Sequence, residues 1–127
     1  MENKNCPCGS GFSYYDCCDR FISGDLLPET ALELMKSRYS AYATKTVNYI
    51  FDTTHPSVQH LTSVENIQDW ADETTWLKLE IVASKENIVE FKATYKDLKG
   101  NENVHHERSN FHFENNKWYY VDGNYYD

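Results

Sequence analysis

The placement of the cysteines constrains this chain more than any other feature of its sequence. All four lie within the first eighteen of 127 residues: Cys6 and Cys8 are separated by one residue, and Cys17 and Cys18 are adjacent after a gap of eight. Two such pairs of thiols can surround one tetrahedral centre, and Zn²⁺ prefers four ligands of this kind. The glycines in the gap permit the positive φ angles that a tight loop around an ion requires. The sequence therefore predicts one structural zinc ion bound by all four cysteines.

Two disulfides, an iron–sulfur cluster and a redox-active dithiol are the alternatives to zinc. A disulfide between the adjacent Cys17 and Cys18 would strain the peptide, and redox dithiols usually read Cys-x-x-Cys, which this sequence lacks. A reducing cytosol also disfavours disulfides. Zinc is the favoured interpretation, and because four thiolates saturate the ion, we expect it to be structural and not catalytic.

The charge balance argues against nucleic acid as the main partner. The chain carries 12 lysines and arginines against 20 aspartates and glutamates, a formal net charge of −8. Such a chain repels phosphates unless its cations are segregated, so we expect no bulk binding of nucleic acid. No apolar stretch reaches the length of a membrane span and no hydrophobic segment follows the N-terminus, so we expect a cytoplasmic protein that does not associate with membranes.

Beyond the cysteines, the hydrophobic pattern changes from a helical period to a period of two near residue 75. Start signals and apolar stripes predict three helices, at residues 31–43, 47–53 and 64–71, the last with Ile67, Trp70 and Ala71 facing inward. Alternation then predicts four strands, at residues 77–82, 89–95, 104–113 and 117–121, with the last ended by Asp122-Gly123-Asn124. Helices followed by antiparallel strands predict an α+β fold.

Arg38 borders the apolar stripe of the first predicted helix. One interpretation is that its stem packs while its guanidinium reaches solvent. The other is that the guanidinium faces a cavity, where it is buried and paired with Glu107 or Asp122. The second interpretation is a prediction that a structure can test directly.

The third predicted strand carries an unusual mixture of side chains. His105, Glu107 and Ser109 share one face and His106 lies on the other, which indicates either a pocket mouth or an edge strand that is wet on both faces. If a pocket exists, we expect Arg38, Tyr42, Glu107, Ser109 and Tyr120 to line it. The candidates for catalysis are His106 or His105 as a base, with Glu107 beside it, and Arg38 or Arg108 as the holder of an anion.

The cysteine segment resembles the SEC-C motif, the zinc module at the tail of the SecA translocase. The resemblance is carried by Cys6-Pro7-Cys8-Gly9-Ser10-Gly11 and by Cys17-Cys18 after the same gap. In SecA the last ligand is often histidine, and here Cys18 occupies that position. Because the SecA module contacts the SecB chaperone and the ribosome, the resemblance implies a docking role on a protein or ribosomal partner.

The whole chain resembles the YchJ family, whose members join a SEC-C head to an NTF2-like body. Five segments carry this resemblance: residues 35–42, 54–57, 76–81, 106–111 and 118–123. It implies a zinc-binding head at residues 1–25 and, at residues 26–127, a cone of three helices packed on a bent sheet of about four strands that encloses a cavity. Family members often carry a second cysteine motif at the C-terminus, which these 127 residues do not contain.

Two hypotheses of function follow. The first is a non-enzymatic adaptor that docks on a protein or ribosomal partner through its zinc head. The second is a pocket enzyme or small-ligand binder that uses the cavity of the cone. The enzyme hypothesis depends on fold analogy, which carries little weight for function, so the adaptor is favoured. Convergence of Arg38, His106, Glu107 and Tyr120 on one enclosed cavity would favour ligand chemistry.

Overall fold

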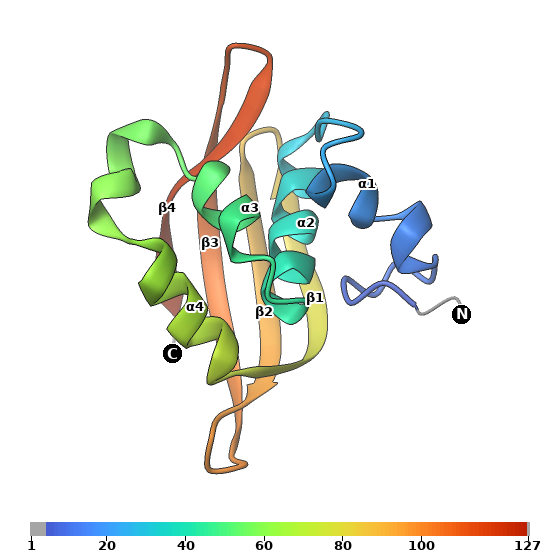
Figure 1. Cartoon of the computed structure of the whole chain (residues 1–127), viewed down its shortest axis with the longest axis vertical. Coiled ribbons are helices and arrows are strands. Elements are labelled where there is room, and N and C mark those ends of the chain that lie inside the picture. Colours follow the sequence, from blue (N-terminus) through green and yellow to red (C-terminus); the bar gives the residue numbers. More distant parts are fainter. Residues whose placement is uncertain (1–4, 127) are drawn as a thin grey trace.

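In the computed structural model, which describes residues 5–126, a curved antiparallel sheet wraps around a layer of helices (Figure 1). Its strands are hydrogen-bonded in the order of the chain, and each adjoins the next. They are β1 (Thr75–Lys85), β2 (Ile88–Lys96), β3 (Glu102–Glu114) and β4 (Lys117–Tyr126). The predicted α+β fold is confirmed.

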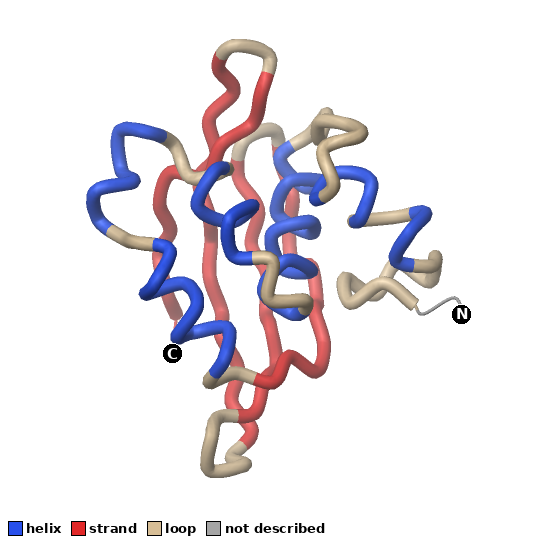
Figure 2. Tube along the Cα trace, in the orientation of Figure 1, coloured by secondary structure: helices blue, strands red, loops and turns tan. Residues whose placement is uncertain are grey.

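The three predicted helices form at the predicted places, and they cover one face of the sheet (Figure 2). They are α2 (Ala31–Ala43), α3 (Val47–Asp52) and α4 (Val64–Asp72). Two begin at side-chain caps, where Thr30 Oγ1 accepts from the Glu33 amide at 3.1 Å and Ser63 Oγ accepts from the Asn66 amide at 3.0 Å. Three short helices were not predicted: η1 (Tyr14–Asp16), α1 (Asp19–Ile22) and η2 (Pro56–Leu61). No helix within residues 5–126 has the length and apolar character needed to cross a membrane.

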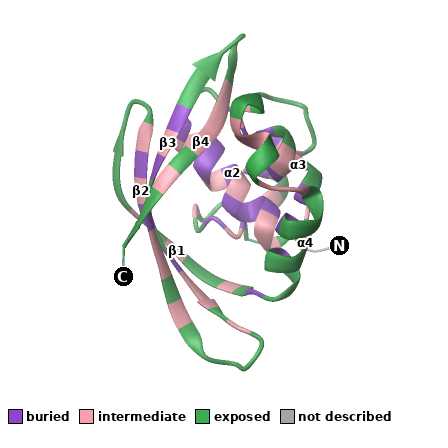
Figure 3. Ribbon diagram, turned by 90° about the vertical axis from the view of Figure 1, so that its left-hand side faces the viewer, coloured by how far each residue is buried: buried purple, intermediate pink, exposed green. Residues whose placement is uncertain are grey.

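The main core lies between α2 and the middle of the sheet (Figure 3). Leu34 and Met35 of α2 pack there with Val89 of β2 and Phe111 of β3. A second apolar cluster joins α3 to α4, with Ile50 and Ile67 among its members. Of the residues predicted to face inward on α4, Ile67 and Ala71 are buried, whereas Trp70 is 37% exposed.

The side chains of β1 do not alternate regularly between the core and solvent. A register irregularity between Trp76 and Lys78 places Trp76 against the core, beside Leu79 and Ile81. Leu77 is turned outward and is 46% exposed. In a regular strand Leu77 would share a face with Leu79 and Ile81, but the irregularity shifts the side-chain alternation by one residue.

The last strand is longer than predicted. Asp122-Gly123-Asn124 does not end β4 but continues it to Tyr126. These residues stay extended because the long β3 offers them partners: Gly123 pairs with Ser109, and Asn124 pairs with Arg108. The extension matters for the site because it brings Tyr125 to the cavity described below.

The cysteine segment packs on the cone instead of standing apart from it. Ile22 of α1 and Leu79 of β1 contact the buried cysteines, and Cys6 Sγ lies 3.4 Å from Ser40 Oγ of α2. Residues 1–4 of the predicted head and residue 127 of the predicted cone lie outside the described residues.

Candidate functional site

The four cysteines meet in space as their spacing predicted. Their Sγ atoms all lie within 4.8 Å of one another, and Cys8 Sγ is 3.6 Å from Cys17 Sγ. With metal–sulfur bonds of about 2.3 Å, the corners of a tetrahedral thiolate site are about 3.8 Å apart. All four thiols are free of disulfides. The cluster therefore fits a metal ion held by Cys6, Cys8, Cys17 and Cys18.

Tight turns and hydroxyl groups support this cluster. Gly9 has φ of 84°, a conformation that glycine adopts without steric cost, and the Cys6 amide donates to the Phe12 carbonyl at 2.9 Å. Two hydroxyls reach the sulfurs, with Ser10 Oγ 3.2 Å from Cys17 Sγ and Ser40 Oγ beside Cys6. Such donors orient thiolate ligands and spread their charge.

The clustered thiols alter one another's pKa values. Hydrogen bonds from Cys18 and Cys8 lower the pKa of Cys6 far below its ordinary value. Cys6 and Cys8 in turn raise the pKa of Cys18. Hydrogen bonding within the cluster thus favours a thiolate at Cys6 and a protonated thiol at Cys18, and a bound cation would favour the thiolate form of both.

A cavity of about 640 Å³ opens between the sheet and the helices. Its wall contains many aromatic side chains, among them Tyr39, Tyr42, Trp70, Trp76, Phe91 and Tyr125. Trp76 contacts aromatic rings on both sides of it, because its ring centroid lies 5.5 Å from that of Tyr39 and 5.9 Å from that of Trp70. The residues predicted for a pocket, Arg38, Tyr42, Glu107, Ser109 and Tyr120, all line this one cavity.

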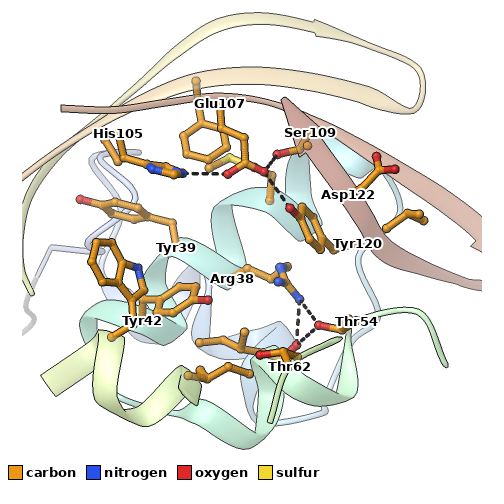
Figure 4. A pocket seen from close by; sticks show the side chains of 18 of the residues that line it. Arg38, Tyr39, Tyr42, Thr54, Thr62, His105, Glu107, Ser109, Tyr120 and Asp122 are labelled. Atoms are coloured by element: carbon orange, nitrogen blue, oxygen red, sulfur yellow. Dashed lines mark hydrogen bonds and ion pairs between the residues drawn. The ribbon is translucent and has the colours of Figure 1, made fainter. Parts of the chain in front are cut away.

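Glu107 of β3 is the buried acid of the cavity, with only 6% of its surface exposed. Its Oε1 accepts from His105 Nε2 at 2.8 Å, and its Oε2 accepts from Ser109 Oγ at 2.7 Å and from Tyr120 Oη at 2.9 Å (Figure 4). Burial acts to raise the pKa of Glu107, but these three donors outweigh it and hold the pKa below its usual value. Glu107 is therefore a carboxylate at neutral pH.

Gly123 makes room for this carboxylate. It pairs with Ser109 across the ladder, two residues from Glu107, and a Cβ built on it would collide with the Glu107 carboxyl group. The absence of a side chain at Gly123 thus leaves the space that the Glu107 carboxylate occupies. The sequence treated this glycine as a turn signal and missed its role at the site.

Arg38 lines the opposite side of the cavity from Glu107 (Figure 4). Its Nη1 donates to the Ile50 carbonyl and to Thr53 Oγ1, both at 2.8 Å, and to Thr54 Oγ1 at 3.3 Å. Within residues 5–126 no carboxylate oxygen lies within 4.0 Å of it, and its Nε and Nη2 have no hydrogen-bond partner. Arg38 is half-buried.

The predicted pairing of Arg38 with Glu107 or Asp122 was therefore wrong. Tyr120 is the physical reason, because its ring lies 4.6 Å below the guanidinium while its hydroxyl bonds to Glu107. The ring stands between the cation and the carboxylate. Thr53 and Thr54, which hold Arg38 instead, follow α3 and had no signal in the sequence beyond hydroxyls near a helix end.

The two neighbouring histidines of β3 have different environments. His105 faces the cavity, where it is bonded to Glu107 and its ring lies 5.2 Å from that of Tyr125 in a tilted arrangement. His106 points to the other face of the sheet, where its Nε2 lies 2.7 Å from Glu90 Oε2. Of the four residues proposed to converge, Arg38, Glu107 and Tyr120 share the cavity and His106 does not, because adjacent residues of a strand face opposite ways. The candidate role of His106 in the pocket was wrong.

Comparison with known proteins identifies the class to which this fold and site belong. The family model described as "YchJ, middle NTF2-like domain" matches residues 30–123, so the body is an NTF2-like domain. The chain belongs to the YchJ family, as its sequence segments predicted.

Relatives and solved structures agree with this assignment. A UPF0225 protein of Haemophilus influenzae (strain 86-028NP) is 47% identical over 127 residues, covering 96% of this chain and 78% of the relative. A UPF0225 protein of Geobacter sulfurreducens is 39% identical over 125 residues, covering 93% and 77%. The solution structure of a SEC-C motif containing protein from Rhodopseudomonas palustris has a TM-score of 0.88 at 36% identity and covers 98% of this chain and 100% of that chain. A crystal structure of a SEC-C motif containing protein from Psychrobacter arcticus has a TM-score of 0.78 at 34% identity and covers 92% and 80%.

Glu107 should make stability depend on pH in the acid range. Its pKa in the folded protein lies below the usual 4.5, so the hydrogen bonds to its carboxylate stabilise the folded state. This stability is fully present above the pKa of an unfolded glutamate, about 4.3. It is lost as the pH falls through the lowered pKa of the folded state. Urea unfolding as a function of pH should therefore show a loss of stability in acid that Glu107→Gln reduces.

At pH 7 the same substitution should lower the free energy of unfolding by about 1–3 kcal/mol, because a glutamine amide offers hydrogens to groups that are themselves donors. Glu102→Gln, which changes an exposed side chain of the same strand, is the matched control and should change little. An unaltered acid profile in Glu107→Gln would contradict this account of the carboxylate.

Proposed function

We propose that this protein binds a small anionic molecule with an apolar, ring-containing body in the cavity of the cone, and that zinc at the four cysteines holds the head against it. The observation that carries the proposal is Arg38, a cation in the cavity wall that has no carboxylate partner among the described residues. Three of the five N–H groups of a guanidinium, those of Nε and Nη2, find no acceptor there.

The anchoring of Arg38 suits a ligand site. The three acceptors around Nη1 and the ring of Tyr120 fix the position of the guanidinium, so little side-chain freedom is lost when an anion binds. The remaining donors form a planar fork, which matches a carboxylate or phosphate. The aromatic wall described above supplies the apolar surface that most small-ligand sites contain.

The His105–Glu107 pair adds chemistry at the other side of the cavity. Glu107 accepts from His105 Nε2, which leaves His105 Nδ1 as an acceptor when the ring is neutral. That nitrogen can take a hydrogen bond or a proton from a bound molecule. The cavity thus combines an anion holder with a proton acceptor, and this arrangement supports ligand binding more directly than it supports an adaptor.

Arg38→Gln should weaken the binding of an anionic, ring-containing probe. With 8-anilinonaphthalene-1-sulfonate and the zinc-loaded full chain, the fluorescence titration should show saturable binding that Arg38→Gln weakens about tenfold or more, because a charge-assisted hydrogen bond contributes about 1.5–3 kcal/mol. Arg108→Gln removes an exposed arginine on β3 and is the matched control. Equal binding to all three proteins, each checked for native circular dichroism, would refute the role of Arg38.

The metal at the cysteines should be zinc, at one ion per chain. Zinc accepts four thiolates in tetrahedral geometry, and Cys17→Ser should lower the zinc content and loosen the head. Because the cluster contacts Ser40 and Leu79 of the cone, the same change should also lower the melting temperature of the whole protein. Elemental analysis of protein purified without added metal checks this, and iron or no metal in place of zinc would contradict it.

Docking through the head is the second candidate function, and two exposed aromatic side chains favour it. Phe12 is 66% exposed and Tyr15 is 57% exposed, and both lie between the cysteine pairs. Aromatic residues of this kind are enriched at the centres of protein interfaces. We therefore propose a protein or ribosomal partner for the head, in keeping with its SEC-C motif.

Co-sedimentation with purified ribosomes tests the ribosomal form of this proposal, and capture from a cell lysate tests the form with a protein partner. The wild-type protein should be retained, and a Phe12→Ser, Tyr15→Ser double variant with a full complement of zinc should not. Leu98→Ser changes a side chain that is 76% exposed and lies in the loop between β2 and β3, so it serves as the control. Docking would be refuted if the wild-type protein and the Leu98→Ser control both failed to bind ribosomes and also failed to capture a protein from the lysate.

A further inference from the structure

A second group of metal-binding side chains lies outside the cysteine head. His55, His112 and Glu114 place their ligand atoms within 4.8 Å of one another. His55 precedes η2, whereas His112 and Glu114 lie on β3 near the β3–β4 hairpin, at the top of Figure 1. We propose that these three residues form a binding site for a divalent transition-metal ion of the zinc class, separate from the four cysteines.

The backbone holds His55 beside the sheet. The His55 amide donates to the Tyr120 carbonyl at 2.9 Å, and the Tyr120 amide donates to the Thr53 carbonyl at 2.8 Å, so this segment continues the sheet as a short parallel bridge. On β3, His112 and Glu114 are two residues apart and therefore share a face. All three positions are thus set by strand pairing and not by mobile loops.

Packing also orients the ring of His55. It meets the rings of His112 and Tyr119 edge-on, each at 5.4 Å between centroids. Its Nδ1 lies 2.8 Å from Ser57 Oγ and accepts from the Ser57 amide at 3.1 Å. A metal ion on Nε2 would require the proton on Nδ1, so Nδ1 would give up the hydrogen bond from the Ser57 amide and donate to Ser57 Oγ instead. An acceptor on the far nitrogen is the usual support for a histidine ligand.

The distances between the ligand atoms suit a small ion. In a tetrahedral site with bonds of about 2.0–2.1 Å, ligand atoms are about 3.3 Å apart. His112 Nε2 already lies 3.4 Å from Glu114 Oε1. His55 Nε2 lies 2.7 Å from the same oxygen, which is a hydrogen-bond distance, so Glu114 must retreat by about 0.6 Å to admit a metal bonded to both. Its side chain is 45% exposed and can make this small movement.

The chemistry of the ligands identifies the class of ion. Two imidazoles and one carboxylate suit zinc, nickel, copper or iron, and they do not suit calcium or magnesium, which prefer oxygen ligands. Three protein ligands leave a coordination position open, in contrast to the closed set of four cysteines. The formal net charge of −8 also favours the approach of a cation.

The test is a zinc titration of the untagged chain of 127 residues, already loaded with one zinc ion at its cysteines. Isothermal titration calorimetry should reveal a second equivalent with micromolar or tighter affinity. His112→Ala and Glu114→Gln alter exposed side chains, so both should stay folded, and each should weaken this second equivalent by at least about tenfold. His60→Ala removes an exposed histidine of η2 outside the cluster and should change nothing.

NMR of the histidine ring nitrogens supplies an independent readout. The second equivalent of zinc should shift the Nε2 signals of His55 and His112 and leave that of His60 in place. The proposal is overturned if no second equivalent of zinc binds, or if it binds only at millimolar zinc. It is also overturned if His112→Ala leaves the second equivalent unchanged, or if His60→Ala abolishes it to the same extent.

Discussion

The contact of Tyr120 with both charged groups of the cavity is the interaction on which the site depends. Its ring lies under the Arg38 guanidinium and its hydroxyl donates to Glu107. A buried cation and a buried carboxylate in direct contact would neutralise each other and fill the cavity with a structural ion pair. Because Tyr120 separates them, Glu107 is satisfied by His105, Ser109 and Tyr120, while Nε and Nη2 of Arg38 have no partner among residues 5–126. The Arg38 guanidinium is therefore the charge to which the proposed ligand would bind.

Helix α2 contacts both the cavity and the cysteine cluster. Ser40 on one of its faces reaches Cys6, whereas Arg38 and Tyr42 line the cavity. Ser37 is fully buried on the same helix and bonds to Tyr49 Oη at 2.7 Å, which ties α2 to α3. The cysteine cluster thus contacts the helix that carries Arg38, the proposed anion holder. Through this contact, a metal ion bound by the cysteines would stabilise the helix beside the cavity.

Features set by local sequence could be predicted, and features set by long-range contacts could not. The cysteine cluster follows from spacing, and α2 and α4 follow from their caps at Thr30 and Ser63. The facing of His105 and Glu107 on one side of β3 follows from alternation, although the sequence left open whether that side lined a pocket. The partners of Arg38, the irregularity after Trp76 and the length of β4 depend on residues far away in the chain. His112 and Glu114 are neighbours by alternation, but only the fold brings His55 to them.

The central claim is that Arg38 remains free in the cavity to bind an anion, and nitrogen-15 NMR of the arginine side chains tests it most directly. On titration of the zinc-loaded protein with benzoate, the Nε–H signal of Arg38 should shift and saturate, whereas those of Arg20 and Arg108 should not. Saturation would show that a carboxylate occupies the unpaired donors of Arg38. An Arg38 signal that does not move, or that moves only as weakly and as linearly as the signals of the other two arginines, would contradict the claim.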